Sequence, residues 1–198
     1  MKTATMRFLS LTAAFGITLA GVGCATSSST GAKPLTTTSG APINLDRYNV
    51  VTVMPFTVTA ANVDPSVGAK LSEDVALRLQ SDFGPLFQEV RRASAPLGAE
   101  NELVVSGNIH SYRAGNKVAR AIFGPPASAN FEGDITVSDA RDGHVLLAAP
   151  FDKFWGWAGI PGASKGIEDM RAETAAAIAN TIAQAKGWRP AVRQSASR

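Results

Sequence analysis

The chain has 198 residues, of which 45% are hydrophobic and 18% charged, a balance typical of a folded globular protein and not of a disordered or coiled-coil one. One cysteine and two histidines exclude a disulfide framework and a cysteine-based metal cluster, so we expect no metal and no other cofactor. The formal charge of +3 includes Lys2 and Arg7. Without these two, 19 − 2 = 17 basic residues face 16 acidic ones, a net charge of +1, so no nucleic-acid partner is expected.

Residues 1–23 have the three-part layout of a secretory signal peptide. A short basic stretch is followed by an uncharged apolar run from Phe8 to Ala20 and then by Gly21-Val22-Gly23. The apolar run is shorter than the roughly 20 residues that a transmembrane helix needs. The pattern therefore indicates a leader that is removed.

The segment from Leu19 to Cys24 resembles a bacterial lipobox. The resemblance implies that Cys24 is the lipid attachment site, with a diacylglycerol on its sulfur and a third chain, such as palmitate, on its amine. Two or more chains are sufficient for stable anchoring in a membrane. Ala25 follows where an aspartate would resemble an inner-membrane retention signal, so we expect an outer-membrane lipoprotein on the periplasmic side. An ordinary signal peptide with an incidental free cysteine is the alternative.

Three regions are expected after the leader. Nine of the 18 residues from Ala25 to Pro42 are Ser or Thr, so we expect residues 24–42 to form the acylated cysteine and a flexible tether. Residues 43–188 are expected to form a single domain of 188 − 42 = 146 residues. Residues 189–198 are expected to be a polar tail.

The domain is expected to begin with a strand from Tyr48 to Met54, whose nearly continuous hydrophobic run is typical of a strand covered on both faces. A helix is expected between Asp64-Pro65, as its start signal, and Gly84-Pro85, as its stop signal. Apolar residues recur at every fourth position of that helix: Val67, Leu71, Val75, Leu79 and Phe83. A short strand is expected within residues 86–92.

The second half of the domain reads as three strands and a helix. Residues 102–112 predict a strand in which Gly107 is expected to mark a bulge. Residues 131–137 alternate between apolar and polar, Asp142-Gly143 is a hairpin turn signal, and residues 145–151 return as the next strand. Ser164 is expected to cap a final helix that ends near Gly187. This order predicts an α+β fold with a mostly antiparallel sheet and two main helices packed on one face.

Residues 102–143 also resemble a bacterial lipoprotein family known as domain of unknown function 4410. The first strand, from Tyr48 to Phe56, fits the same family. The resemblance implies an exported, lipid-anchored α+β domain, and it implies no activity. The matching residues are Leu103-Val104-Val105, Gly107, Gly115-Asn116, Arg120, Gly124, Val137, Asp139-Ala140 and Gly143.

Two stretches are candidate binding sites. Arg113, Asn116, Lys117 and Arg120 form the densest basic cluster, which suits lipid A phosphates, peptidoglycan carboxylates or an acidic partner. The alternative is that this cluster braces its own loop, and we expect Arg113 to brace and Arg120 to contact a partner. The second stretch is rich in aromatic residues and includes Trp155 and Trp157, which serve either core packing or an interface contact.

No catalytic residue is assigned from the sequence. Gly162 to Gly166 fits the G-x-S-x-G pattern, but no histidine lies beyond His144. Neither His110 nor His144 has a carboxylate and a serine suitably placed in its own stretch of sequence. The leading hypothesis is a non-enzymatic envelope lipoprotein that binds an envelope protein or polymer. The alternatives are a hydrolase acting on envelope polymers and an accessory subunit of an export or assembly complex.

Overall fold

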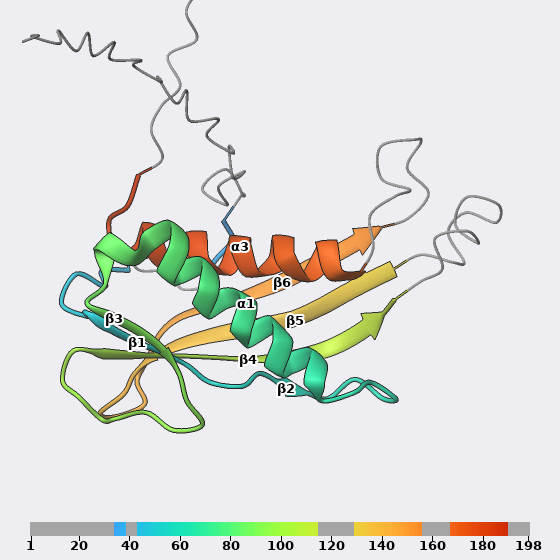
Figure 1. The fold of residues 1–198 in the computed structure, drawn as a ribbon, viewed down its shortest axis with the longest axis horizontal. Helices are drawn as coiled ribbons and strands as arrows, with labels where there is room; N and C mark the ends of the chain where they lie inside the picture. The colour runs from blue at the N-terminus through green and yellow to red at the C-terminus, as the bar shows by residue number, and fades with distance from the viewer. Residues whose placement is uncertain (1–33, 39–42, 115–128, 156–166, 190–198) are drawn as a thin grey trace, which may run out of the picture.

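The computed structural model describes residues 34–38, 43–114, 129–155 and 167–189. Two helices lie on one face of a six-stranded sheet whose main path runs β3-β1-β4-β5-β6, with β2 pairing with β4 (Figure 1). The strands are β1 (Val50–Val53), β2 (Thr57–Val58), β3 (Glu89–Arg92), β4 (Glu102–Arg113), β5 (Ala129–Asp139) and β6 (Val145–Trp155). The helices are α1 (Ser66–Phe83), a short 3-10 turn η2 (Gly84–Leu86), and α3 (Ile167–Ala185).

The sheet is mixed, so the prediction of a mostly antiparallel sheet is wrong, although the α+β class holds. Strand β1 pairs in parallel with both β3 and β4, and β2 is also parallel to β4. The physical reason is that α1 crosses over the sheet between β1 and β3. A helical crossover returns the chain in its starting direction, whereas a tight hairpin reverses it. The continuous hydrophobic run of β1 agrees with this, because parallel strands are usually covered on both faces.

The helix start signal at Asp64-Pro65 works as predicted. The Asp64 carboxylate accepts a 2.8 Å hydrogen bond from the Ser66 amide, which satisfies one of the free N–H groups at the start of α1. The predicted apolar stripe faces the sheet, and Leu71, Val75 and Leu79 are fully buried. The stop signal also holds, because α1 ends at Phe83 and η2 follows it.

Strands β4, β5 and β6 form an antiparallel unit, as the alternating sequence and the Asp142-Gly143 turn predicted. The bulge in β4 lies between Ile109 and Ser111, so its predicted place at Gly107 is wrong. Gly107 has a different role. A Cβ at that position would stand 2.9 Å from the Phe56 ring and 2.8 Å from the Asp134 carbonyl oxygen.

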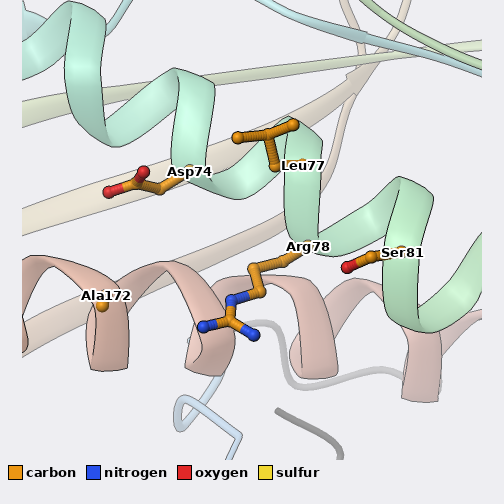
Figure 2. A pocket seen from close by; sticks show the side chains of 5 residues that line it. All are labelled: Asp74, Leu77, Arg78, Ser81 and Ala172. Atoms are coloured by element: carbon orange, nitrogen blue, oxygen red, sulfur yellow. The ribbon is translucent and has the colours of Figure 1, made fainter. Parts of the chain in front are cut away.

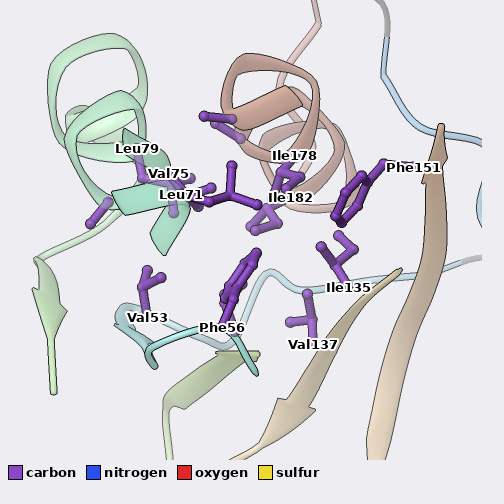
Figure 3. Close-up of a cluster of buried hydrophobic side chains, with 14 of the residues drawn as sticks. Val53, Phe56, Leu71, Val75, Leu79, Ile135, Val137, Phe151, Ile178 and Ile182 are labelled. Carbon is purple, nitrogen blue, oxygen red and sulfur yellow. The ribbon is translucent and has the colours of Figure 1, made fainter. Parts of the chain in front are cut away.

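The core fills the space between the two helices and the sheet (Figure 3). Leucine and isoleucine side chains from α1 and α3 meet residues from the strands below, and nearly all are shielded from water. Among the described residues, no helix is long and apolar enough to cross a membrane. The side chains labelled in Figure 3 are Val53, Phe56, Leu71, Val75, Leu79, Ile135, Val137, Phe151, Ile178 and Ile182.

Residues 34–38 contact the domain, although they lie within the range expected to be the tether. The Leu35 amide donates a 2.8 Å hydrogen bond to Oγ1 of Thr181 on α3. The Thr38 amide donates a 2.9 Å hydrogen bond to the Ala148 carbonyl on β6. Leu35 is partly buried against the core. The surface of the domain therefore includes chain that composition alone assigned to the linker.

Candidate functional site

One face of the β4-β5-β6 unit is covered by the helices, and the other, here called the open face, is not. Side chains alternate between these faces, so in β5 every second residue is buried and those between are partly exposed. Most of the side chains on the open face are small or polar and at least partly exposed. The apolar exceptions are Val104, which is buried, and Val145 and Pro150, which are exposed. The small and polar residues are Ser106, Asn108, His110, Ser111, Asn130, Glu132, Asp134, Thr136, Ser138, Ala148 and Asp152.

A polar cluster lies at the middle of the open face. His110 contacts the Asp134 carboxylate through Nε2. Nδ1 of the same ring lies 3.3 Å from Nδ2 of Asn108 and 3.4 Å from Oγ1 of Thr59. The cluster therefore joins two strands, β4 and β5, and the residue that follows β2.

The cluster brings together a hydroxyl, an imidazole and a carboxylate, which are the groups of a catalytic triad. Its geometry favours recognition over nucleophilic catalysis. The Thr59 hydroxyl has acceptors in the Asn108 side chain at 3.1 Å and the Ile109 carbonyl at 3.3 Å. The His110 and Asp134 side chains are 50% and 46% exposed, whereas catalytic groups normally work in a concave, water-poor site.

Sequence reasoning missed this cluster because its members come together only through strand register. Asp134 follows His110 by 24 residues and pairs with Asn108 across the antiparallel ladder. The bulge after Ile109 then places the His110 ring beside the carboxylate. The usable signal was the alternation of residues 131–137, which put Asp134 on the exposed face, but the position of the bulge was needed as well.

The end of this face at the start of β4 is covered by the loop of residues 93–101. That loop wraps over Glu102, whose side chain is fully buried and paired with Arg91 at 2.9 Å. Burial alone would raise the pKa of Glu102, but hydrogen bonds to its carboxylate outweigh burial and lower the pKa from 4.5 to about 2. The hydrogen bonds to the Glu102 carboxylate hold the loop of residues 93–101 in place. The loop covers only this end of the open face. The donors are the Thr52 hydroxyl, the Arg91 guanidinium and the amides of Leu97, Gly98 and Ala99.

A groove of about 280 Å³ lies on the other side of the molecule, between α1 and α3 (Figure 2). Its lining includes Leu77, which is 54% exposed, and Asp74. The Asp74 carboxylate is held at 2.6 Å by Arg171 across the two helices. Because its acidic group is already paired, the groove is a seam between the helices and not a catalytic pocket. His110 and Asp134 line neither this groove nor the two grooves beside residues 34–38.

Most of the residues singled out by sequence fall outside the described part of the chain. Arg113 is described: it is exposed, ends β4 and lies opposite Asn130, and within the described ranges no ion pair is found for it. Trp155 ends β6, where it pairs with Ala129. The remaining candidates, Cys24, Asn116, Lys117, Arg120 and Trp157, lie outside the described residues, as does the Gly162–Gly166 motif. The structure therefore brings together none of the predicted site residues that it describes.

No group of three or more His, Cys, Asp or Glu side chains within the described ranges is arranged to hold a metal ion. The His110 and Asp134 pair supplies two donors, and the nearest neighbours of the ring are an amide and a hydroxyl. What the arrangement offers is a set of hydrogen-bond donors and acceptors on an accessible surface.

The fold and the open face together define an α+β domain with one face closed by helices and one polar face free for contact. The sequence profile described as "Domain of unknown function (DUF4410)" matches residues 51–159. The chain belongs to this family, as its resemblance predicted. The comparison with curated proteins gives no match.

Solved structures with a similar fold include PelC from Paraburkholderia phytofirmans, described as a dodecamer. Its L103M variant is 18% identical to this chain, with a TM-score of 0.52 over 75% of this chain and 96% of that one. Lipoprotein GNA1162 from Neisseria meningitidis is 14% identical, with a TM-score of 0.42 over 69% of this chain and 99% of that one. At these identities the comparison with PelC shows the fold alone.

Proposed function

We propose that this protein is a non-enzymatic, lipid-anchored envelope protein, held at the periplasmic side of the outer membrane by Cys24, that binds an envelope protein or polymer through its open face. The observation that carries the proposal is the open face itself. A strand face that is lined by Ser, Thr, Asn and carboxylates, and is left uncovered while the other is closed by helices, is suited to hydrogen bonding with a partner.

The arrangement of charges on the open face supports a role in binding. Glu132 and Asp152 lie directly opposite each other on neighbouring strands. Like charges in this position destabilise a sheet, and Asn130 offsets part of this cost by donating a 2.9 Å hydrogen bond to Glu132. A destabilising arrangement on an exposed surface is more easily explained by contact with a partner than by folding.

The hydrolase alternative is less well supported by the described residues. The arrangement that resembles a triad, Thr59 with His110 and Asp134, lies on a half-exposed surface. It lines neither the groove between α1 and α3 nor the two grooves beside residues 34–38. We therefore favour binding, and Asp134→Asn separates the two functions, because loss of a hydrolytic activity in that variant would favour the enzyme.

The decisive experiment places a photo-crosslinking amino acid at Thr136, on the open face, in intact cells that produce the full-length protein. The control places it at Lys70, which is exposed on α1. We expect a specific adduct from Thr136 and none of the same size from Lys70. Crosslinks to another envelope protein or to a polymer support the proposal.

Two results would overturn it. Adducts of equal yield from both positions would show that the open face is not selective. Adducts that contain only a second copy of this chain would make the open face a subunit interface. Anchoring is tested separately: Cys24→Ser should abolish lipid labelling and release the protein from outer-membrane fractions, and an unmodified Cys24 in the mature wild-type protein would exclude a lipoprotein.

A further inference from the structure

The segment of residues 34–38, here called the strap, crosses from the sheet to the helical layer. At one end, the amide and the hydroxyl of Thr38 donate hydrogen bonds of 2.9 Å and 3.0 Å to the Ala148 carbonyl on β6. At the other end, the Leu35 amide donates to Thr181 on α3. The strap lies beside α3 in Figure 1. The first described residue of the chain, Pro34, therefore lies at the helical layer.

The contact at α3 is specific. Thr181 is buried, with 4% of its surface exposed. Its Oγ1 accepts a 2.8 Å hydrogen bond from the Leu35 amide and donates a 2.7 Å hydrogen bond to the Ala177 carbonyl. Both the donor and the acceptor capacity of this hydroxyl are used. Pro34 and Leu35 line a groove with Ile43 and Leu147, so the strap is held by apolar packing as well as by backbone hydrogen bonds.

The strap shortens the connection to the proposed anchor. Cys24 and Pro34 are 34 − 24 = 10 positions apart, which allows a reach of at most about 35 Å. A flexible chain of this length has a typical end-to-end distance of about 17 Å. Because the connection starts at the helical layer, this layer stays closer to the anchor than the open face does.

Charge does not distinguish the two sides. The open face carries Glu132, Asp134 and Asp152 on two neighbouring strands, and each of the two helices also carries three carboxylates, so an anionic membrane surface repels both. The connection through the strap is therefore what favours turning the open face away from the lipid headgroups.

We infer that the strap orients the domain on the membrane, with the helical layer toward the lipid surface and the open face turned away from it toward its partner. This inference rests on the proposed anchoring at Cys24. It assigns Leu35 and Thr181 a role in setting the orientation of the domain. It also identifies the lipid surface as the partner of the helical layer.

Two exposed leucines on opposite sides of the molecule provide matched probes. Leu77 lies on α1 in the helical layer and is 54% exposed, and Leu97 lies in the loop over the open-face side and is 65% exposed. Each is replaced by cysteine in the full-length lipidated protein, in which Cys24 is the one native cysteine and is blocked by acylation. After labelling with a fluorophore, the proteins are reconstituted into phosphatidylethanolamine and phosphatidylglycerol vesicles that contain a headgroup quencher.

We expect stronger quenching of the Leu77 probe than of the Leu97 probe. Leu35→Ser and, separately, Thr181→Val should release the strap and remove that difference. Thr36→Ala is the control, because the Thr36 side chain is exposed and its loss should leave the difference unchanged. Circular dichroism verifies that each variant is folded, and the two release variants act on different partners of the same contact.

Equal quenching of both probes in the lipidated wild-type protein would overturn the inference and leave the proposed function intact. A difference that survives both release variants would show that the strap does not set the orientation. If mass spectrometry finds Cys24 unlipidated, the anchoring proposal fails first, and the inference fails with it.

Discussion

The Tyr48 hydroxyl donates a 2.8 Å hydrogen bond to the Asp139 carboxylate, although 91 residues separate them in the chain. The contact joins the turn before β1 to the last residue of β5. Tyr48 is 1% exposed and Asp139 is 5% exposed, so the bond is shielded from water. Arg47 closes the arrangement, since its guanidinium donates to the Tyr48 hydroxyl at 2.6 Å and to the Asp139 carboxylate at 2.8 Å.

Tyr48→Phe should lower the free energy of unfolding by about 1–3 kcal/mol, because it removes a donor from a buried carboxylate while keeping the ring in the core. Urea unfolding followed by circular dichroism measures the change. Ser81→Ala is the control: it removes an exposed hydroxyl and should stay within about 0.5 kcal/mol of the wild type. A change in Tyr48→Phe no larger than in the control would show that the bond contributes nothing to stability.

Glu102 should be the most costly carboxylate to replace. Glu102→Gln keeps the size of the side chain but removes the charge that pairs with Arg91, and the new amide opposes the amides of Leu97 and Gly98. We expect a loss of about 3 kcal/mol or more at neutral pH, as is usual when one partner of a buried ion pair is removed. Equilibrium unfolding in urea provides the measurement, with Glu100→Gln, an 87% exposed carboxylate, as the control.

The same residue should make stability depend on pH. The pKa of Glu102 is about 2 in the folded protein against an ordinary 4.5, so the folded state favours the ionised form. This contribution is fully present above the ordinary pKa and is lost as the pH falls toward the folded one. The difference in stability between wild type and Glu102→Gln should thus be constant above a pH of about 4.5 and shrink in more acidic buffers. A difference independent of pH would contradict this assignment.

The helices and the antiparallel strands could be predicted because their signals are local. The four-residue recurrence from Val67 to Phe83 and the alternation of residues 131–137 each identify both an element and its buried face. The parallel part of the sheet could not be predicted, because strand direction is set by how the chain returns after α1. Strand β3 also has four residues, two of them arginines, which leaves little hydrophobic pattern to read.

Gly133 illustrates a packing requirement that alternation alone does not reveal. It lies on the buried face of β5, opposite Phe151 of β6. A Cβ at this position would collide with the Phe151 ring and with the Asn108 carbonyl of β4. The glycine thus allows an aromatic ring to fill the core at this point.

Gly133→Ala should destabilise the domain by about 1–3 kcal/mol or more, because neither the ring nor the neighbouring strand can move without disturbing the sheet. Gly84→Ala is the matched control, since a Cβ there meets nothing within 4 Å and its backbone is helical. The control should be neutral or stabilised by up to about 1 kcal/mol. Thermal unfolding compares the two, and equal melting temperatures would mean that the core absorbs the extra methyl group.

The candidate site was less predictable than the fold for a physical reason. A binding surface on a sheet is assembled from residues on different strands, so its members share no spacing along the chain. His110 and Asp134 meet through antiparallel register and a bulge. Leu35 was overlooked for a related reason: a single apolar residue in a Ser- and Thr-rich segment gives no periodic signal, and its partner Thr181 is 146 residues away.

Arg113 tests whether the basic cluster after β4 braces the fold. The sequence led us to expect a brace at this position, but the structure shows an exposed side chain, and no described residue forms an ion pair with it. Arg113→Ala should therefore change the free energy of unfolding by less than about 0.5 kcal/mol. Arg171→Ala is the positive control, because Arg171 joins α3 to Asp74 of α1 at 2.6 Å with both side chains about a quarter exposed. Its loss should cost about 1 kcal/mol.

Arg120 lies outside the described residues, and its expected role in contact stays a prediction. Pull-down yields of the lipidated Arg113→Ala and Arg120→Ala variants from envelope fractions, taken beside their unfolding curves, separate the two roles. A drop in stability for Arg113→Ala as large as that for Arg171→Ala would restore Arg113 as a brace, whereas reduced yield at unchanged stability would place it in a binding surface.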